Sequence, residues 1–249
     1  MVYGPWSMVL LQGVFMNPED LIPVFQEHYE NNLESVILYG SAAGKNFVEK
    51  YSNYNLLVLI KTEVETNLLA GAKQIKQWLK KNPPPLIWDL NFFKNSIDVF
   101  PLEFIELQKH HRILFGKPLP PFEVELKNLR HQVEMELRGK YLQIRHHPSY
   151  FLGESREYIQ FLLKTLPSML ALFKGVLYLA KKEPEESWKR RIEQLAFLAD
   201  FHPEVFLNLV SIREEQLPLP RKAEIWEIVE AFLTELRSII KCVNNLEAL

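Results

Sequence analysis

A Gly-Ser pair directly after an apolar run is the first feature of the sequence that could do chemistry. Residues 33–39 have Val, Ile and Leu at their centre, and Gly40 and Ser41 follow them. If a helix begins at this pair, its free backbone N–H groups and the serine hydroxyl face an anion, and the glycine lets a phosphate approach the backbone. Lys45 would add a positive charge nearby. The pattern predicts a phosphate-binding turn formed by Gly40, Ser41 and Lys45.

Two asparagines stand at the start of the next apolar run. Asn53 and Asn55 lead into residues 55–61, which are continuous enough in Leu, Val and Ile for a strand buried on both faces. Residues at positions i and i+2 of a strand point to the same face. We therefore expect the two amides to project together toward the anion bound at Gly40.

The surrounding residues predict an α/β domain that positions these groups. The expected strands cover residues 33–39, 55–61, 86–90 and 97–104, and the expected helices cover residues 17–31 and 63–81. Three prolines within residues 116–121 end the pattern, because proline continues neither a helix nor a central strand. We expect one domain over residues 1–118 and a second over residues 119–249.

The second half of the chain changes to a helical period. Apolar residues recur every three or four positions, as they do on the buried face of a helix. Helical patterns cover residues 126–144, 154–182, 187–200, 203–211 and 222–244, with no strand signal among them. The predicted fold class is a mixed sheet with flanking helices, α+β or α/β, followed by an all-α bundle.

The order of these motifs resembles that of the DNA polymerase β-like nucleotidyltransferase superfamily. That family has an apolar strand, Gly-Ser, a spacer, and then acid-x-acid on the following strand. Here eleven residues separate Ser41 from Asn53. The segment around Asp98, Ser-Ile-Asp-Val-Phe, looks like the strand that carries the family's third acid. The resemblance covers about residues 17–118 and implies a nucleotidyltransferase-like fold.

The resemblance also implies a loss of charge at the family's metal site. Its members hold two Mg²⁺ ions with three carboxylates, and hard cations need such anionic oxygen ligands. Here Asn53 and Asn55 replace two of the three acids, which leaves Asp98 as a weak metal ligand at most. We expect a catalytically degenerate protein, a pseudoenzyme, that needs no cofactor. Mg²⁺ is expected only if activity survives.

Three functional hypotheses remain open. The leading one is binding of a nucleoside triphosphate or a partner in the cleft between the two domains, with Arg130 and Arg138 of the long helix facing that cleft. The second is an active, metal-dependent nucleotidyltransferase that uses Asp98, with Glu49 or Glu103 supplying a displaced acid. The third is a non-catalytic interaction module whose helical bundle binds a protein partner or a second copy of the chain.

Composition narrows the choice of partners. The chain has 29 basic and 31 acidic residues, a formal charge of −2, so no global field draws it to nucleic acid or to an anionic membrane. Cys242 is the only cysteine, which excludes an intrachain disulfide and suits the cytoplasm, where we expect the protein to reside. The apolar stretch 158–180 contains Lys164, Pro167 and Lys174, which favours a buried helix over a membrane span.

Overall fold

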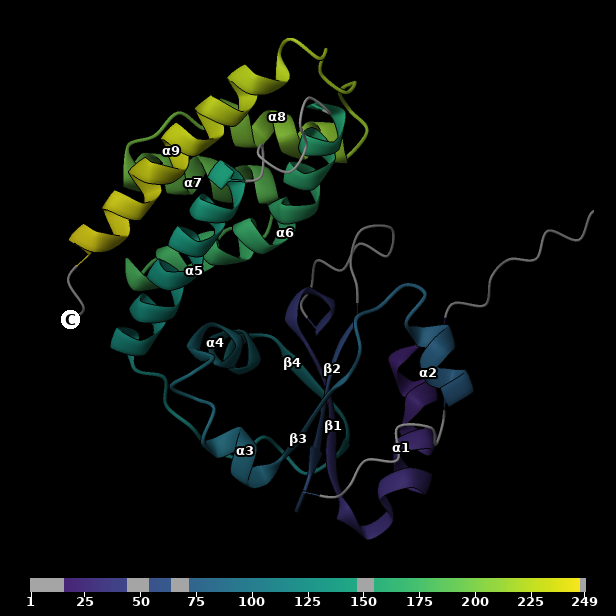
Figure 1. The fold of residues 1–249 in the computed structure, drawn as a ribbon. Coiled ribbons are helices and arrows are strands. Elements are labelled where there is room, and N and C mark those ends of the chain that lie inside the picture. The colour runs from purple at the N-terminus through teal and green to yellow at the C-terminus, as the bar shows by residue number, and fades with distance from the viewer. Residues whose placement is uncertain (1–15, 44–53, 64–71, 147–154, 247–249) are drawn as a thin grey trace, which may run out of the picture. The chain divides into compact units, whose positions relative to one another are not determined.

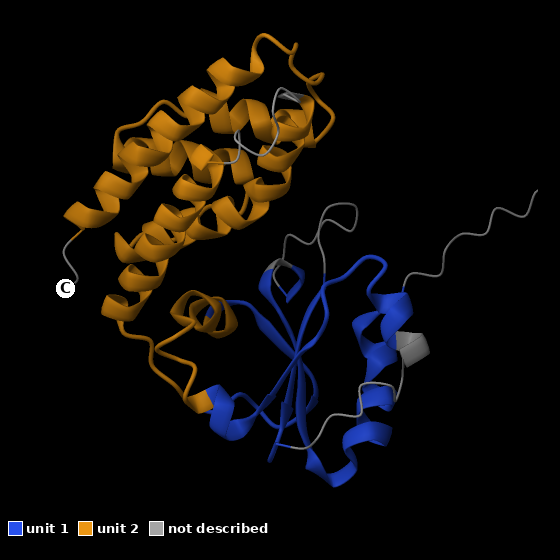
Figure 2. Ribbon diagram, viewed as in Figure 1, with its two compact units in different colours: residues 1–93, 109–120 blue, residues 94–108, 121–249 orange. Residues whose placement is uncertain are grey.

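The chain folds into two compact units in the computed structural model, which describes residues 16–43, 54–63, 72–146 and 155–246 (Figures 1 and 2). Unit 1 comprises residues 1–93 and 109–120, and unit 2 comprises residues 94–108 and 121–249. The last change of unit, after Pro120, falls close to the boundary expected after residue 118. The segment 94–108 groups with the helical unit.

A four-stranded mixed sheet forms the centre of unit 1. Its strands are β1 (Leu33–Tyr39), β2 (Asn55–Ile60), β3 (Leu86–Asp89) and β4 (His111–Gly116), in the order β3-β2-β1-β4. Strand β1 runs antiparallel to β2 and β4, whereas β2 and β3 are parallel. The three strands expected over residues 33–39, 55–61 and 86–90 are therefore confirmed, and β4 is an additional strand.

Helices of unit 1 cover one face of this sheet. The short helices η1 (Pro18–Leu21) and η2 (Glu30–Asn32) flank α1 (Ile22–Tyr29), and α1 and α2 (Ala72–Trp78) lie on the same side of the strands (Figure 1). Buried Phe25 and Trp78 pack in one cluster with the strand residues of that face, such as Val36. On the other face Ile37 is also fully buried, as the continuous apolar run predicted.

The strand expected over residues 97–104 is wrong. Residues 95–99 form turns after α3 (Leu90–Lys94), and the helix α4 (Pro101–Lys109) follows. Proline is well suited to a first helical position, because the N–H it lacks has no partner within the helix there.

Strand β4 ends at Gly116, where φ is +85° and a Cβ atom would lie 2.0 Å from the carbonyl oxygen of Glu34, so only glycine fits.

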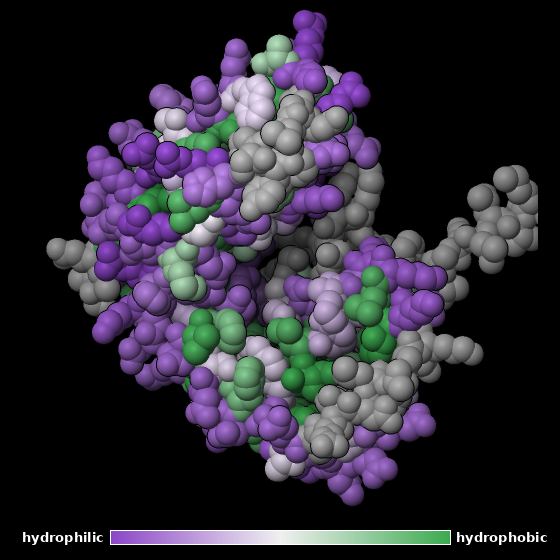
Figure 3. Space-filling model, in the orientation of Figure 1, coloured by the Kyte–Doolittle hydropathy of each residue, from purple (hydrophilic) through white to green (hydrophobic). Residues whose placement is uncertain are grey.

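Unit 2 is a bundle in which no strand occurs among the described residues. Besides α4 it contains α5 (Leu126–His146), α6 (Ser155–Leu179), α7 (Trp188–Ala199), α8 (Glu204–Arg213) and α9 (Ile225–Asn245). In its core the ring of Phe206 lies 5.2 Å from that of Phe173 and 4.8 Å from that of Phe232, which joins α8 to α6 and α9. The surface of this unit is predominantly hydrophilic on the face shown in Figure 3. The all-α prediction is confirmed.

Helix α6 is the one described helix that is long and apolar enough to cross a membrane. The most apolar 18-residue segment within residues 156–179 is 67% buried inside the structure. Several of its side chains, among them Tyr158 and Phe173, are fully buried in the core of unit 2. Its composition is therefore accounted for by packing in the centre of the bundle.

Candidate functional site

The end of β1 and the start of β2 bring Gly40 and Asn55 into contact. Tyr39 pairs with Asn55 on one side and with His111 on the other, so the chain leaves β1 between two neighbouring strands. Gly40 has a φ of +77°, and a Cβ atom at this position would lie 3.1 Å from the amide nitrogen of Asn55. The left-handed backbone and the close amide both favour glycine at residue 40.

The turn after Gly40 differs from the helix expected there. Residues Gly40–Ala43 form η3, a single 3₁₀ turn. The N–H of Gly40 donates to the carbonyl of His110 at 3.0 Å and is therefore not available to an anion. The N–H of Ser41 has no acceptor within this turn, because 3₁₀ hydrogen bonds join residues three apart and begin with the N–H of Ala42. A phosphate contact with the backbone of this turn would use the N–H of Ser41.

Four of the residues that the sequence assigns to the site are outside what the structure describes. Lys45, Glu49 and Asn53 lie outside the described residues, and the side chain of Ser41 is not described. The grouping of Asn53 with Asn55 and of Lys45 with Gly40 therefore stays a prediction. The observed part of the site consists of Gly40, the backbone of η3 and the amide of Asn55.

A second asparagine, which is not among the residues predicted for the site, fixes the start of β2. The buried side chain of Asn82 accepts a hydrogen bond from the N–H of Tyr54 at 2.9 Å. The ring of Tyr54 stacks on that of Trp78 with 6.1 Å between centroids, and Trp78 Nε1 donates to the carbonyl of Pro83 at 2.6 Å. These contacts anchor the residue that immediately precedes Asn55.

The strand beside β2 carries no acid near Asn55. Strand β3 reads Leu-Ile-Trp-Asp, and its acid, Asp89, pairs with Ile60 at the other end of β2. Ile60 is five residues beyond Asn55, which is about 16 Å along a strand. The Asp89 carboxylate also accepts hydrogen bonds from the N–H groups of Asn91 and Phe92, at 2.8 and 2.9 Å. It therefore caps α3.

Asp98 does not lie on a strand next to the site. It is an exposed residue in the turns between α3 and α4, and it belongs to unit 2, whereas Gly40 and Asn55 belong to unit 1. No cluster of three or more Asp, Glu, His or Cys side chains suited to a metal ion occurs in the part of the chain that the structure describes. Among the described residues, the Asn55 side chain lies against Gly40.

Glu103, considered as a substitute acid, forms part of a polar network inside unit 2. It lies on α4 and accepts a hydrogen bond from Gln132 Nε2 at 3.0 Å, and the same nitrogen donates to Glu136 at 3.0 Å. Gln132 Oε1 accepts from the N–H of Leu102 at 2.9 Å, so this buried amide joins α5 to α4. Burial raises the pKa of Glu103 above its ordinary value of 4.5.

The two arginines expected to face an interdomain cleft contact the end of α9 within unit 2. Arg130 donates to the carbonyls of Val243 and Asn244, each at 3.3 Å. Arg138 forms an ion pair with Glu134 at 2.9 Å and donates to Asn244 Oδ1 at 3.2 Å. Positive groups at a helix C-terminus satisfy its unpaired carbonyls and favour its dipole. Both arginines thus join α5 to α9, and their role in a cleft stays a prediction.

Comparison with solved structures finds a weak likeness to a nucleotidyltransferase. The structure is that of the spectinomycin adenyltransferase AAD(9) from Enterococcus faecialis, solved with ATP and spectinomycin. The match covers 90% of this chain and 95% of that chain, with 13% sequence identity and a TM-score of 0.37. No protein-family model and no curated protein matches the sequence. A likeness of this strength assigns no residue and no activity.

Proposed function

We propose that this protein is a degenerate nucleotidyltransferase-fold protein whose α/β unit binds the phosphates of a nucleotide without transferring them. The observation that carries the proposal is the contact between Gly40 and Asn55 at the junction of β1 and β2. In the superfamily that the sequence resembles, a metal-binding carboxylate occupies the position of Asn55. Here an amide stands beside the glycine of the Gly-Ser pair.

The charge of this junction determines which ligand it suits. Two Mg²⁺ ions require several anionic oxygens, and an amide oxygen contributes only a dipole. An amide nitrogen and backbone N–H groups are instead hydrogen-bond donors for phosphate oxygens. The proposed donors are the Asn55 amide and the N–H and hydroxyl groups of Ser41, and Lys45 would supply the positive charge that metal ions supply in an active enzyme.

The proposal is tested by titration calorimetry of the full chain with ATP, GTP, CTP and UTP, each with and without Mg²⁺. We expect at least one nucleotide to bind without Mg²⁺, and Asn55→Ala to weaken that binding together with Ser41→Ala and Lys45→Ala. Asp98→Asn is the matched control, and we expect it to leave the affinity unchanged. Strictly Mg²⁺-dependent binding that Asp98→Asn abolishes would refute the proposal in favour of an active enzyme, and no binding would refute it outright.

Restoring the acids separates lost charge from lost geometry. If only the charges differ from the active pattern, the double variant Asn53→Asp and Asn55→Asp gains Mg²⁺ binding that the unaltered chain lacks. Its metal-free nucleotide affinity falls, because two carboxylates repel the phosphates. A variant that gains no Mg²⁺ binding but keeps its nucleotide affinity contradicts the placement of these residues at the phosphates.

A further inference from the structure

A basic groove runs between α5 and α9 on the surface of unit 2. It has a volume of about 590 Å³, and four cationic side chains line it: Arg138 and Arg145 from α5, and Arg237 and Lys241 from α9. Arg138 and Arg145 are seven residues apart and so lie on one face of α5, about 10 Å apart along its axis. Arg237 and Lys241 are four residues apart and share a face of α9. Two cationic stripes therefore border one groove.

Three of the four positive charges in this groove are not balanced by acids of the described chain. None of the residues that line it is acidic, although the whole chain has a formal charge of −2. Arg138 pairs with Glu134, which lies outside the lining. Within the described residues no ion pair or hydrogen bond engages the side chains of Arg145, Arg237 or Lys241, which are all exposed. Like charges four residues apart on a helix destabilise it slightly, so folding alone gives no reason for this arrangement.

The rest of the lining is apolar enough to pack against a base or a sugar. Leu142 lies between the two α5 arginines on the same helix face and is 50% exposed, and half-buried Tyr141 lies beside it. The groove is open to solvent, whereas pockets for small ligands enclose most of the ligand surface. Three of the four cations are arginines, whose planar forks match phosphate oxygens. An open groove with this lining suits a polymer that lies along it.

We propose that the α5–α9 groove binds the phosphodiester backbone of a single-stranded nucleic acid. The contacts would be local, in agreement with the absence of a global positive charge, and they would be independent of the nucleotide proposed for unit 1. Arg145, Arg237 and Lys241 contact the phosphates, Arg138 contributes the donors that Glu134 and Asn244 leave unused, and Leu142 and Tyr141 pack against the bases.

The salt dependence of binding gives a quantitative test. A protein that neutralises Z phosphates of a single strand shows a slope of about −0.7Z in a plot of log K against log[salt]. Three or four contacts predict a slope of about −2 to −3. The measurement is fluorescence anisotropy of a labelled oligouridylate titrated with the full chain at several salt concentrations. A slope near zero, or no binding at low salt, overturns the proposal.

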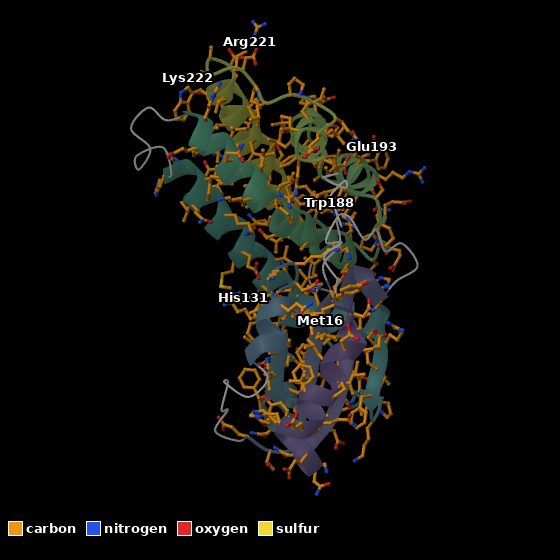
Figure 4. All side chains as sticks on the ribbon, turned by 90° about the vertical axis from the view of Figure 1, so that its right-hand side faces the viewer. Met16, His131, Trp188, Glu193, Arg221 and Lys222 are labelled. Carbon is orange, nitrogen blue, oxygen red and sulfur yellow. The ribbon has the colours of Figure 1, made fainter. Side chains whose placement is uncertain are left out.

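Two double variants with equal charge change locate the contact. Arg237→Gln with Lys241→Gln removes two contacts, so we expect about 25-fold weaker binding at ~0.1 M salt and a slope smaller by about 1.4. The control is Arg190→Gln with Lys222→Gln, since both are exposed and lie outside the groove; Lys222, labelled in Figure 4, precedes α9. We expect the control to bind like the unaltered chain. Equal losses in both double variants would show diffuse attraction and refute a site in the groove.

Free nucleotide distinguishes a strand from a small ligand. ATP at the same total phosphate concentration should displace the oligouridylate much less effectively than an unlabelled strand does, because only the strand spans the groove. If ATP displaces the oligouridylate as effectively as the strand does, and if Arg237→Gln with Lys241→Gln abolishes this displacement, the groove is a nucleotide pocket. That result would overturn the proposal that a polymer binds there. Loss of ATP binding in the Asn55→Ala variant, with strand binding intact, would separate this site from the one proposed in unit 1.

Discussion

Two glycines in the long helices of unit 2 should respond differently to the same substitution. Gly139 lies inside α5, and a Cβ atom added there would meet nothing within 4 Å. Gly175 lies inside α6, and a Cβ atom there would lie 2.5 Å from Cγ2 of Val133 and 3.5 Å from Cδ1 of Leu102. Gly139→Ala therefore adds a methyl group to open space, whereas Gly175→Ala inserts one between packed helices.

The expected free energies follow from these distances. Alanine is about 0.8–1 kcal/mol more favourable than glycine in a helix interior, so Gly139→Ala should stabilise the fold by roughly that amount. Gly175→Ala has the same helical gain but must displace Val133, which is fully buried and β-branched. Overpacking of this kind costs about 1–3 kcal/mol. The helical gain cancels in the comparison, so the two variants should differ by about 1–3 kcal/mol.

Urea unfolding followed by far-ultraviolet circular dichroism measures both variants, because both glycines belong to the helical unit that dominates this signal. The urea concentration at the midpoint of unfolding should be higher for Gly139→Ala than for the unaltered chain, and lower for Gly175→Ala than for Gly139→Ala. The slope of the unfolding free energy against urea concentration should stay the same in both variants. In thermal unfolding Gly139→Ala should raise Tm by roughly 2–4 °C. Equal stabilisation by the two substitutions would refute the packing of Gly175 against Val133, and no gain from Gly139→Ala would refute its open surroundings.

Three further substitutions test other parts of the structure. Asn82→Ala should destabilise unit 1 by about 1–3 kcal/mol in urea unfolding, because it leaves the part-buried N–H of Tyr54 without an acceptor. Asn82→Asp should retain most of the stability. Burial raises the pKa of Glu103, so its charged form opposes folding and wild-type stability falls as pH rises through that pKa. The stability of Glu103→Gln relative to wild type should therefore increase as the pH rises above 4.5, the ordinary pKa of a glutamate, and a difference that does not change with pH would contradict this. The largely buried Glu106 carboxylate lies 2.7 Å from Lys174 Nζ. Lys174→Met leaves this carboxylate without that cation and should lower the free energy of unfolding by about 2–4 kcal/mol. The double variant that adds Glu106→Leu should recover part of the lost stability.

Local sequence patterns predicted most of the elements for identifiable reasons. The run Leu56 to Ile60 is buried on both faces of the sheet, so its continuous apolar composition was a sufficient signal. The apolar period of α5 follows from its packing against the core, with Leu129, Val133 and Leu137 fully buried. Strand β4 is not predicted because all of its residues are exposed or half-buried, and its apolar run is limited to Ile113, Leu114 and Phe115.

The helix α4 shows where a local pattern misleads. Residues 97–104 are rich in Ile, Val and Phe and were assigned to a strand, but Pro101 starts a helix whose buried side chains, Leu102 and Ile105, join the core of unit 2. Propensity for a strand is a weak preference that such packing outweighs. Asp98 belongs to the same segment, and it therefore lies in an exposed turn and not on the expected strand.

The sequence by itself determined the chemistry of the groups: a Gly-Ser pair, two asparagine amides at the start of the next apolar run, and a nearly neutral chain with one cysteine. These depend only on residue types and their spacing. The tertiary structure decided which groups meet. Strand register puts the Asn55 amide against Gly40, antiparallel pairing brings the His110 carbonyl to the Gly40 N–H, and helix packing collects cations from α5 and α9 in one groove. Such contacts join residues far apart in the chain, and no local pattern encodes them.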